Sequence, residues 1–363
     1  MFGSTYSGRR ILITGHTGFK GSWLSLWLQR LGASVTGYAL APLTEPSLYE
    51  LSEFSGDSVI GDIRDQHNFA KHLERSQPEI VFHLAAQPSV LVSYADPLET
   101  FSTNVMGTAN VLEACRQCAS VKAVIVVTTD KCYENQEWLW GYRENDTLGG
   151  RDPYSASKAC AELVAQSYRR SFCSGTDTQG QPTLLVATAR AGNVIGGGDW
   201  TSDRLVPDIM RAAALEIPVQ IRNPASSRPW QHVLDCLCGY LLLGQGLLKG
   251  QVELAEAWNF GPDLDGNLGV GEVAQLISNH WPQSTTLYPD VTDKPHEANL
   301  LMVDSTKART KLKWQPVWDI QTTLMHTTHW YRAYYEEGNL ITQHQIQAYE
   351  QSAAQAGAEW AIC

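Results

Sequence analysis

The chain lacks the features of a membrane-spanning or nucleic-acid-binding protein. Its 363 residues contain no apolar run of about 18 residues, the length that indicates a membrane-spanning helix. Positive charge is scarce, since 27 Lys and Arg face 38 Asp and Glu and leave a formal net charge of −11. Such a charge repels the phosphate backbone of nucleic acid, which argues against a general basic binding face. Any phosphate-bearing ligand must therefore be met by local groups.

A targeting segment and a disulfide framework are also missing. Residues 1–10 run into a predicted strand without the apolar core or cleavage site of a secretory signal, which predicts a cytoplasmic location. The eight cysteines are then expected to be reduced thiols. Cys115 and Cys118 have the spacing of half a zinc site, but no second pair follows at ligand distance, so no metal is predicted.

Short β-branched runs alternate with helical patterns through the first half of the chain. Buried strands separated by helices indicate a parallel sheet covered on both faces, so the predicted fold class is α/β, with a Rossmann-like, doubly wound sheet. Six strands are expected at 10–14, 34–38, 58–60, 80–84, 123–128 and 183–191. Helices are expected around Leu24, Trp27, Leu28 and Leu31, and at 65–76, 104–118 and 155–172.

The pattern becomes loop-rich after residue 191, which predicts two domains. Residues 1–191 are predicted to form a Rossmann domain that binds a dinucleotide and carries the catalytic residues. Residues 192–363 are predicted as a smaller α/β substrate-binding domain with helices at 207–215 and 271–279 and a helical segment over 320–363. Some late segments are expected to return to the first domain. Ligands of doubly wound sheets bind beyond the carboxyl ends of the strands.

A glycine-rich turn between the first strand and the first helix predicts a dinucleotide site. Gly15, Gly18 and Gly21 have no Cβ, which allows backbone N–H groups to approach a pyrophosphate at the helix N-terminus. The alternative interpretation of this glycine spacing is a tight turn that binds no ligand. Asp62, after the third strand, could accept from an adenine amine. The candidate cofactor-binding residues are Gly15, Thr17, Gly18, Phe19, Lys20, Gly21, Asp62, Ile63, Ala85, Ala86, Gln87, Asn104, Tyr154 and Lys158.

The end of the second predicted strand lacks the acidic residue that commonly binds ribose hydroxyls. It reads Gly37-Tyr38-Ala39-Leu40, with no carboxylate before Glu45. It also lacks an Arg or Lys that would favour a 2′-phosphate. NAD is therefore favoured over NADP as the cofactor.

Two short segments supply candidate catalytic groups. Tyr154 and Lys158 lie one helical turn apart, so the ammonium and a positive nicotinamide ring would stabilise the phenolate and make it a base. Thr129, Asp130 and Lys131 follow the fifth strand and are expected to face the same cleft. A hydroxyl there can orient a substrate, and the acid and the amine can move protons. Solvated side chains on a helix face and a charged loop are the alternatives.

Together these segments resemble the extended short-chain dehydrogenase/reductase family, and within it the nucleotide-sugar 4,6-dehydratases. The resemblance covers nearly the whole chain and is carried by residues 14–24, 129–131, 153–158, 191–200, 228–233 and 295–298. It implies a lyase that forms a homodimer or homotetramer and reuses bound NAD in each turnover. It also implies conversion of CDP-glucose to CDP-4-dehydro-6-deoxy-D-glucose and water, for deoxysugar and O-antigen polysaccharide synthesis. The cytosine base rests on the resemblance alone.

The resemblance also implies roles for the catalytic candidates. Thr129 orients the C4 hydroxyl of glucose, Tyr154 removes its proton as hydride passes to NAD, and Lys158 lowers the phenol pKa and holds the nicotinamide ribose. Elimination of water across C5 and C6 and return of the hydride to C6 follow. The related dTDP-glucose enzymes use an Asp-Glu pair, whereas this chain has Asp130 and Lys131. Our hypothesis makes Asp130 the acid and Lys131 the base, neutral through burial or the nicotinamide charge.

The resemblance also implies residues that bind the diphosphate of the substrate. Guanidinium groups suit a pyrophosphate in an otherwise acidic protein, although an ion pair is the alternative for each arginine. Two other functions stay open: an NAD-dependent nucleotide-sugar 4-epimerase, which needs no acid–base pair, and a non-catalytic dinucleotide-binding sensor, which commonly lacks the Tyr and Lys. The candidate substrate-binding residues are Asn193, Arg204, Arg228, His232 and Lys294.

Overall fold

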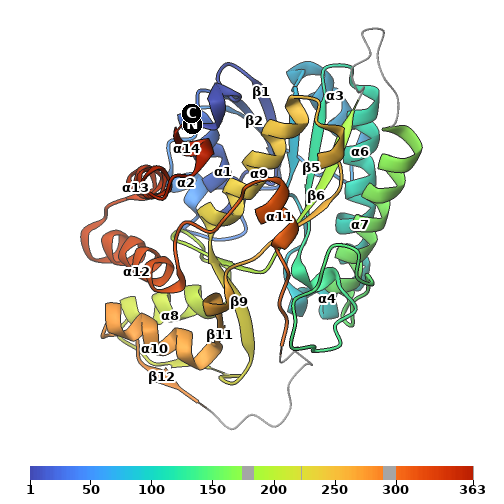
Figure 1. Ribbon diagram of the computed structural model, residues 1–363. Coiled ribbons are helices and arrows are strands. Elements are labelled where there is room, and N and C mark those ends of the chain that lie inside the picture. Colours follow the sequence, from blue (N-terminus) through green and yellow to red (C-terminus); the bar gives the residue numbers. More distant parts are fainter. Residues whose placement is uncertain (174–183, 222, 289–299, 363) are drawn as a thin grey trace.

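The computed structural model describes residues 1–173, 184–221, 223–288 and 300–362. Its centre is a seven-stranded sheet in the order β10-β6-β5-β4-β1-β2-β3, with every neighbouring pair parallel (Figure 1). The predicted fold class is confirmed. The strands are β1 (Arg10–Thr14), β2 (Ser34–Ala39), β3 (Asp57–Ile60), β4 (Ile80–His83), β5 (Ala123–Val127), β6 (Leu185–Ala191) and β10 (Ala257–Phe260).

The six strands predicted from the sequence are all present, and their ends differ from the prediction by two residues at most. Residue 183, at the start of the sixth prediction, lies outside the described residues. The seventh strand, β10, is absent from the prediction because its four residues, Ala-Trp-Asn-Phe, contain no β-branched side chain. Its pairing with β6 extends the sheet from a segment about 70 residues later in the chain.

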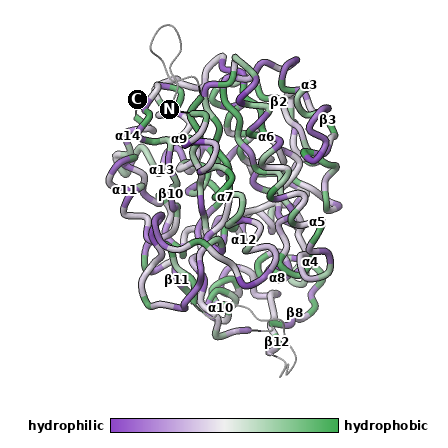
Figure 2. Tube along the Cα trace, turned by 90° about the vertical axis from the view of Figure 1, so that its right-hand side faces the viewer, coloured by the Kyte–Doolittle hydropathy of each residue, from purple (hydrophilic) through white to green (hydrophobic). Residues whose placement is uncertain are grey.

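Helices cover both faces of the sheet, as Figure 1 shows. One face packs in a hydrophobic cluster with α1 and α9, through residues such as Ile11 and Ile13. The alternating residue Leu12 points to the other face and packs with α3, α6 and α7. Hydrophilic residues gather around the edge strand β3 (Figure 2). The five helices are α1 (Phe19–Arg30), α3 (Gln66–Ser76), α6 (Gly107–Gln117), α7 (Pro153–Phe172) and α9 (Val233–Leu248).

A smaller unit lies beyond one end of the sheet (Figure 1). It contains a three-stranded sheet in the order β11-β9-β7 and a two-stranded sheet of β12 and β8. The helices α8 and α10 contact one another and α12 (Ile320–Glu337). These elements are β7 (Asn193–Ile195), α8 (Leu205–Ala214), β8 (Val219–Gln220), β9 (Ser227–His232), β11 (Asn267–Gly269), α10 (Val270–His280) and β12 (Thr286–Leu287).

The second half of the chain does not stay in the smaller unit. Strand β10 joins the large sheet, and α9 packs on β5, β6 and α1. The division of the chain into two domains at residue 191 therefore stays a prediction.

The short elements are α2 (Leu48–Leu51), α4 (Val90–Ala95), α5 (Pro97–Phe101) and α11 (Thr306–Lys311), the π-helical turn η2 (Ser102–Met106), and the 3-10 turns η1 (Phe2–Ser4), η3 (Asp130–Cys132), η4 (Val252–Leu254) and η5 (Leu264–Gly266).

The C-terminal segment is helical, as predicted, and consists of α12 (Ile320–Glu337), α13 (Thr342–Gln355) and α14 (Glu359–Ile362). A buried carboxylate on α9 holds this segment to the body. Asp235 Oδ1 accepts hydrogen bonds from the Val317 backbone N–H at 2.6 Å and from the Tyr349 hydroxyl at 2.7 Å. None of the described helices is long and apolar enough to cross a membrane.

Asp235 is expected to make stability depend on pH. Burial raises its pKa from 3.8 to about 7, so its contribution to stability is fully present below pH 3.8 and is lost as pH rises through about 7. The unfolding free energy of the wild type should therefore fall by about 2.5 kcal/mol relative to that of Asp235→Asn between pH 5 and pH 7.5. Urea unfolding at several pH values measures this, with Asp57→Asn on exposed β3 as the control. A difference between Asp235→Asn and the wild type that does not change with pH would contradict it.

Candidate functional site

The glycine turn shows which of its glycines the fold requires. Gly15 has φ +77°, and a Cβ there would lie 2.7 Å from the backbone N of Ala85 after β4. A Cβ on Gly21 would lie 2.1 Å from the Gly15 carbonyl oxygen. Gly18 is different, because it is exposed, has an ordinary φ of −82°, and would place its Cβ 3.4 Å from its nearest neighbour. Packing explains Gly15 and Gly21, whereas Gly18 leaves room at the N-terminus of α1.

Two side chains of the turn contact other elements. The Lys20 amine lies 3.5 Å from the Tyr240 hydroxyl and 3.8 Å from the Cys236 sulfur, both on α9. The Thr17 hydroxyl donates to the Leu40 carbonyl oxygen at 2.9 Å, which ties the turn to the end of β2. The Lys20 charge also lowers the pKa of Lys158, which places the Lys20 amine near the catalytic candidates.

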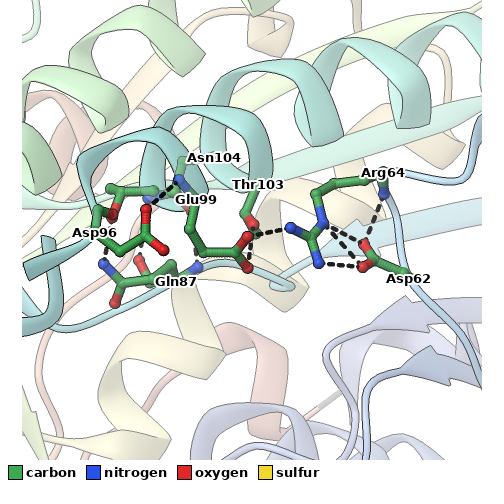
Figure 3. Close-up of polar contacts among 8 residues, drawn as sticks. Asp62, Arg64, Gln87, Asp96, Glu99, Thr103 and Asn104 are labelled. Carbon is green, nitrogen blue, oxygen red and sulfur yellow. Dashed lines mark hydrogen bonds and ion pairs between the residues drawn. The ribbon is translucent and has the colours of Figure 1, made fainter.

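The predicted adenine acceptor, Asp62, is held by an arginine that sequence reasoning missed (Figure 3). Arg64 donates to both Asp62 carboxylate oxygens, from its backbone N–H at 2.8 Å and from Nε at 2.9 and 3.0 Å. These bonds lower the pKa of Asp62. Arg64 also pairs with Glu99 on α5. The neighbouring Ile63 is 4% exposed and packs in the core, so only its backbone could face a ligand.

Asn104 is buried behind the loop that follows β4, with 1% of its surface exposed. Its Oδ1 accepts from the Gln87 backbone N–H at 2.8 Å (Figure 3). Its Nδ2 donates to the Gln87 carbonyl oxygen and the Ser157 hydroxyl. Asn104 thus positions this loop, which contains the half-buried Ala85, Ala86 and Gln87, and a cofactor contact by Asn104 stays a prediction.

The structure brings Tyr154 and Thr129 together. Tyr154 lies in the first turn of α7 and is 9% exposed, and the Thr129 hydroxyl is its hydrogen-bond partner. Burial raises the pKa of Tyr154 to about 12, while Thr129 and Arg204 lower it. Lys158 lies one turn further along α7, and its stabilisation of the phenolate stays a prediction. Its amine donates to the Val127 carbonyl oxygen at 3.3 Å, and burial lowers the pKa of Lys158 to about 8.

Asp130 and Lys131 lie beside this pair, in η3. Asp130 is 1% exposed; its Oδ1 accepts from the Thr129 hydroxyl at 2.9 Å, and its Oδ2 has no hydrogen-bond partner. The Lys131 amine lies 3.9 Å from Asp130 Oδ1, and its side chain is 32% exposed. An unpartnered buried carboxylate oxygen beside a hydroxyl and an amine suits proton transfer.

Three of the predicted substrate-binding residues lie on the smaller unit near these groups. Arg204 donates to Asp199 Oδ2 at 2.9 Å and lowers the pKa of Tyr154, so it lies near the phenol. Asn193 begins β7 and is half-buried. Arg228 lies on the neighbouring strand β9 and donates to the Ser227 carbonyl oxygen at 2.8 Å. These positions are compatible with diphosphate binding, which stays a prediction.

The other two predicted residues cannot be placed at the site. His232 is 0% exposed, and its ring lies against Trp23 and Trp318. Its Nδ1 accepts from the Leu234 backbone N–H at 3.2 Å and caps α9. A diphosphate contact by His232 is therefore corrected to a capping role in the core. Lys294 lies outside the described residues.

Known proteins are similar to this chain over most of its length. The profile of a family described as GDP-mannose 4,6 dehydratase matches residues 12–327. The chain belongs to this family. The chain is similar to CDP-glucose 4,6-dehydratase of Salmonella typhimurium. The two are 48% identical over 331 residues, and the alignment covers 91% of this chain and 92% of that protein.

Solved structures resemble this family member over most of its length. Epimerase Mth375 of Methanothermobacter thermautotrophicus superposes with a TM-score of 0.79 at 24% identity, covering 92% of this chain and 95% of that one. A dTDP-glucose 4,6-dehydratase of Streptomyces venezuelae, solved with NAD bound, superposes with a TM-score of 0.75 at 25% identity, covering 89% and 97%. The first comparison supports the fold alone.

Proposed function

We propose that this protein is a CDP-glucose 4,6-dehydratase that uses bound NAD to form CDP-4-dehydro-6-deoxy-D-glucose and water in the cytoplasm. The observation that carries the dehydratase assignment is the buried Asp130 carboxylate, with its free oxygen, between the Thr129 hydroxyl and the Lys131 amine. A 4-epimerase needs no such group. The 48% identity to a CDP-glucose enzyme supports the choice of nucleotide.

The residues at the strand ends fit NAD. Gly18 leaves the N-terminus of α1 open to a pyrophosphate, and the ionised Asp62 carboxylate is fixed near the end of β3. The β2 end has Leu40 where a cation for a 2′-phosphate would be expected, which favours NAD over NADP. The turn from Gly15 to Gly21 would hold the diphosphate.

The chain's own groups would then move the protons of the reaction. Thr129 orients the C4 hydroxyl, and Tyr154 accepts its proton. Lys131 removes the C5 proton, which the adjacent ketone acidifies, and Asp130 protonates the C6 hydroxyl as it leaves as water. Bound NAD supplies a reversible acceptor for the hydride that C4 loses and C6 regains. The protein therefore needs three proton-transfer groups within one small region, and Tyr154, Lys131 and Asp130 supply them.

The proposal includes a homo-oligomer. Apolar side chains are exposed along α4, α5, η2 and α7, four elements that contact one another. Burial of such a patch against a second copy would remove apolar surface from water. Its members are Val92 at 48%, Leu98 at 81%, Met106 at 57% and Leu163 at 51% exposure.

Substrates labelled with deuterium test the function. The purified protein with NAD is incubated with CDP-glucose, UDP-glucose, dTDP-glucose and GDP-mannose, each deuterated at C4 of the hexose. We expect CDP-glucose to give a 4-keto-6-deoxy sugar with deuterium at C6, and the other three to react far more slowly. A 4-epimer product would show an epimerase, and inertness toward all four would favour a dinucleotide-binding sensor.

A further inference from the structure

A buried ion pair connects the elements that carry the catalytic candidates. Glu162 lies on α7, one turn beyond Lys158, and Arg190 lies on β6. Their side chains are 1% and 3% exposed, and the carboxylate and guanidinium are 2.8 Å apart. None of the proton transfers proposed above uses either residue. Burying two charges is costly, and both side chains also bind further polar groups.

The two carboxylate oxygens of Glu162 bind residues of two neighbouring strands, β5 and β6. Oε1 accepts from the Thr128 hydroxyl at 2.5 Å, at the end of β5. Oε2 accepts from the Thr188 hydroxyl at 2.7 Å and from Arg190 Nη2 at 2.8 Å, both on β6. Because Thr128 directly precedes Thr129, the carboxylate fixes the Thr129 backbone relative to α7, which carries Tyr154.

Glu162 also acts on Lys158 through its charge. Burial and Lys20 lower the pKa of Lys158, whereas Glu162 and Cys132 raise it. The titratable groups that affect or are affected by Lys158 are Lys20 on α1, His83 on β4, Cys132 on η3 and Glu162 on α7. Those around Glu162 are Arg190 on β6, Arg169 and Lys158 on α7, and Cys132 on η3.

We propose that Glu162 is a positioning residue, an inference that rests on the function proposed above. Its carboxylate holds the Thr128–Thr129 strand end against α7 and keeps the Lys158 amine protonated in the range where the enzyme works. A purely structural ion pair with Arg190 would perform neither task. The two tasks are separable, because one depends on the hydrogen bond to Thr128 and the other on negative charge.

The charge is tested by the pH dependence of kcat in Glu162→Gln. Removing an opposite charge should favour the neutral amine, so the loss of activity at alkaline pH should begin about one pH unit lower than in the wild type. Glu336→Gln, which breaks an exposed ion pair with Arg332 on α12, is the control and should leave the profile unchanged. An alkaline limb at the wild-type position in Glu162→Gln would overturn this half of the proposal.

The hydrogen bond is tested by a matched pair that keeps the charge. Thr128→Val frees the β5 end and should lower kcat about 10-fold with little change in KM and no shift of the alkaline limb. Thr188→Val removes an equally buried hydroxyl from the same carboxylate, whose Oε2 still has Arg190, and should change kcat less than about 2-fold. Equal losses in the two variants would overturn the positioning role, and this comparison does not require Glu162→Gln to fold.

A third measurement does not depend on turnover. Reductive methylation with ¹³C-formaldehyde labels lysine amines for NMR, and Lys158→Arg identifies the Lys158 signal. Its titration midpoint should be lower in Glu162→Gln than in the wild type. If the wild type fails to convert CDP-glucose but this shift is seen, the proposed function fails and the electrostatic role stands; an unshifted midpoint overturns that role.

Discussion

Replacing Tyr154 with phenylalanine is expected to lower kcat for CDP-glucose by about 10²–10⁴-fold, the usual contribution of a general base. The hydroxyl is the only group removed, and it is the hydrogen-bond partner of Thr129 at the start of α7. Because the ring stays in place, affinity for NAD and the free energy of unfolding should change little. Steady-state kinetics, NAD titration followed by tryptophan fluorescence, and urea unfolding measure the three quantities.

Tyr168 provides the matched control on the same helix. Its hydroxyl hydrogen-bonds to Glu113 at 3.2 Å on the outside of α7, so Tyr168→Phe should leave kcat near the wild-type value. If Tyr154→Phe kept more than about a tenth of the wild-type rate, a different base would be required. Arg204, the cation found to lower the phenol pKa, should then be re-examined together with Lys158.

Sequence reasoning predicts the large sheet well because its strands are continuous β-branched runs, such as Ala123–Val127. It also predicts which loops meet, since the carboxyl ends of parallel strands lie at one edge. The direction in which an individual side chain points is harder to predict from the sequence. Lys20 belongs to the glycine turn but reaches α9, and His232 belongs to a substrate-side motif but caps a helix in the core.

The polar networks behind the site are missed for a physical reason. Arg64 pairs with Glu99, and Glu162 with Arg190, across 35 and 28 residues respectively, and neither spacing has a periodic signature. Such pairs depend on tertiary packing, which a single sequence does not display. One signal was available for the backbone part of this contact, because Asp side chains in turns commonly accept from the backbone N–H two residues later, as Asp62 does from Arg64.

Lys131→Met is expected to stop dehydration, lowering kcat by about 10²–10⁴-fold while affinity for NAD and CDP-glucose stays near the wild-type value. Methionine keeps the length of the side chain and removes the amine, whose distance from Asp130 Oδ1 is 3.9 Å. Lys122→Met, at the exposed start of β5, is the control and should behave as the wild type. Near-normal turnover in Lys131→Met would refute its role as the base.

Comparison with Asp130→Asn then assigns the two proton transfers. If Lys131 is the base, Lys131→Met should fail to exchange the C5 proton of the bound sugar with deuterated solvent. If Asp130 is the acid, Asp130→Asn should still exchange that proton but release no water. The amide has no acidic proton to give to the C6 hydroxyl, whereas the Asp130 carboxyl, whose Oδ2 lacks a hydrogen-bond partner, does. The reverse pattern would exchange the two roles. Exchange in neither variant would mean that the buried acid and the exposed amine act as one unit, which their contact through Asp130 Oδ1 permits.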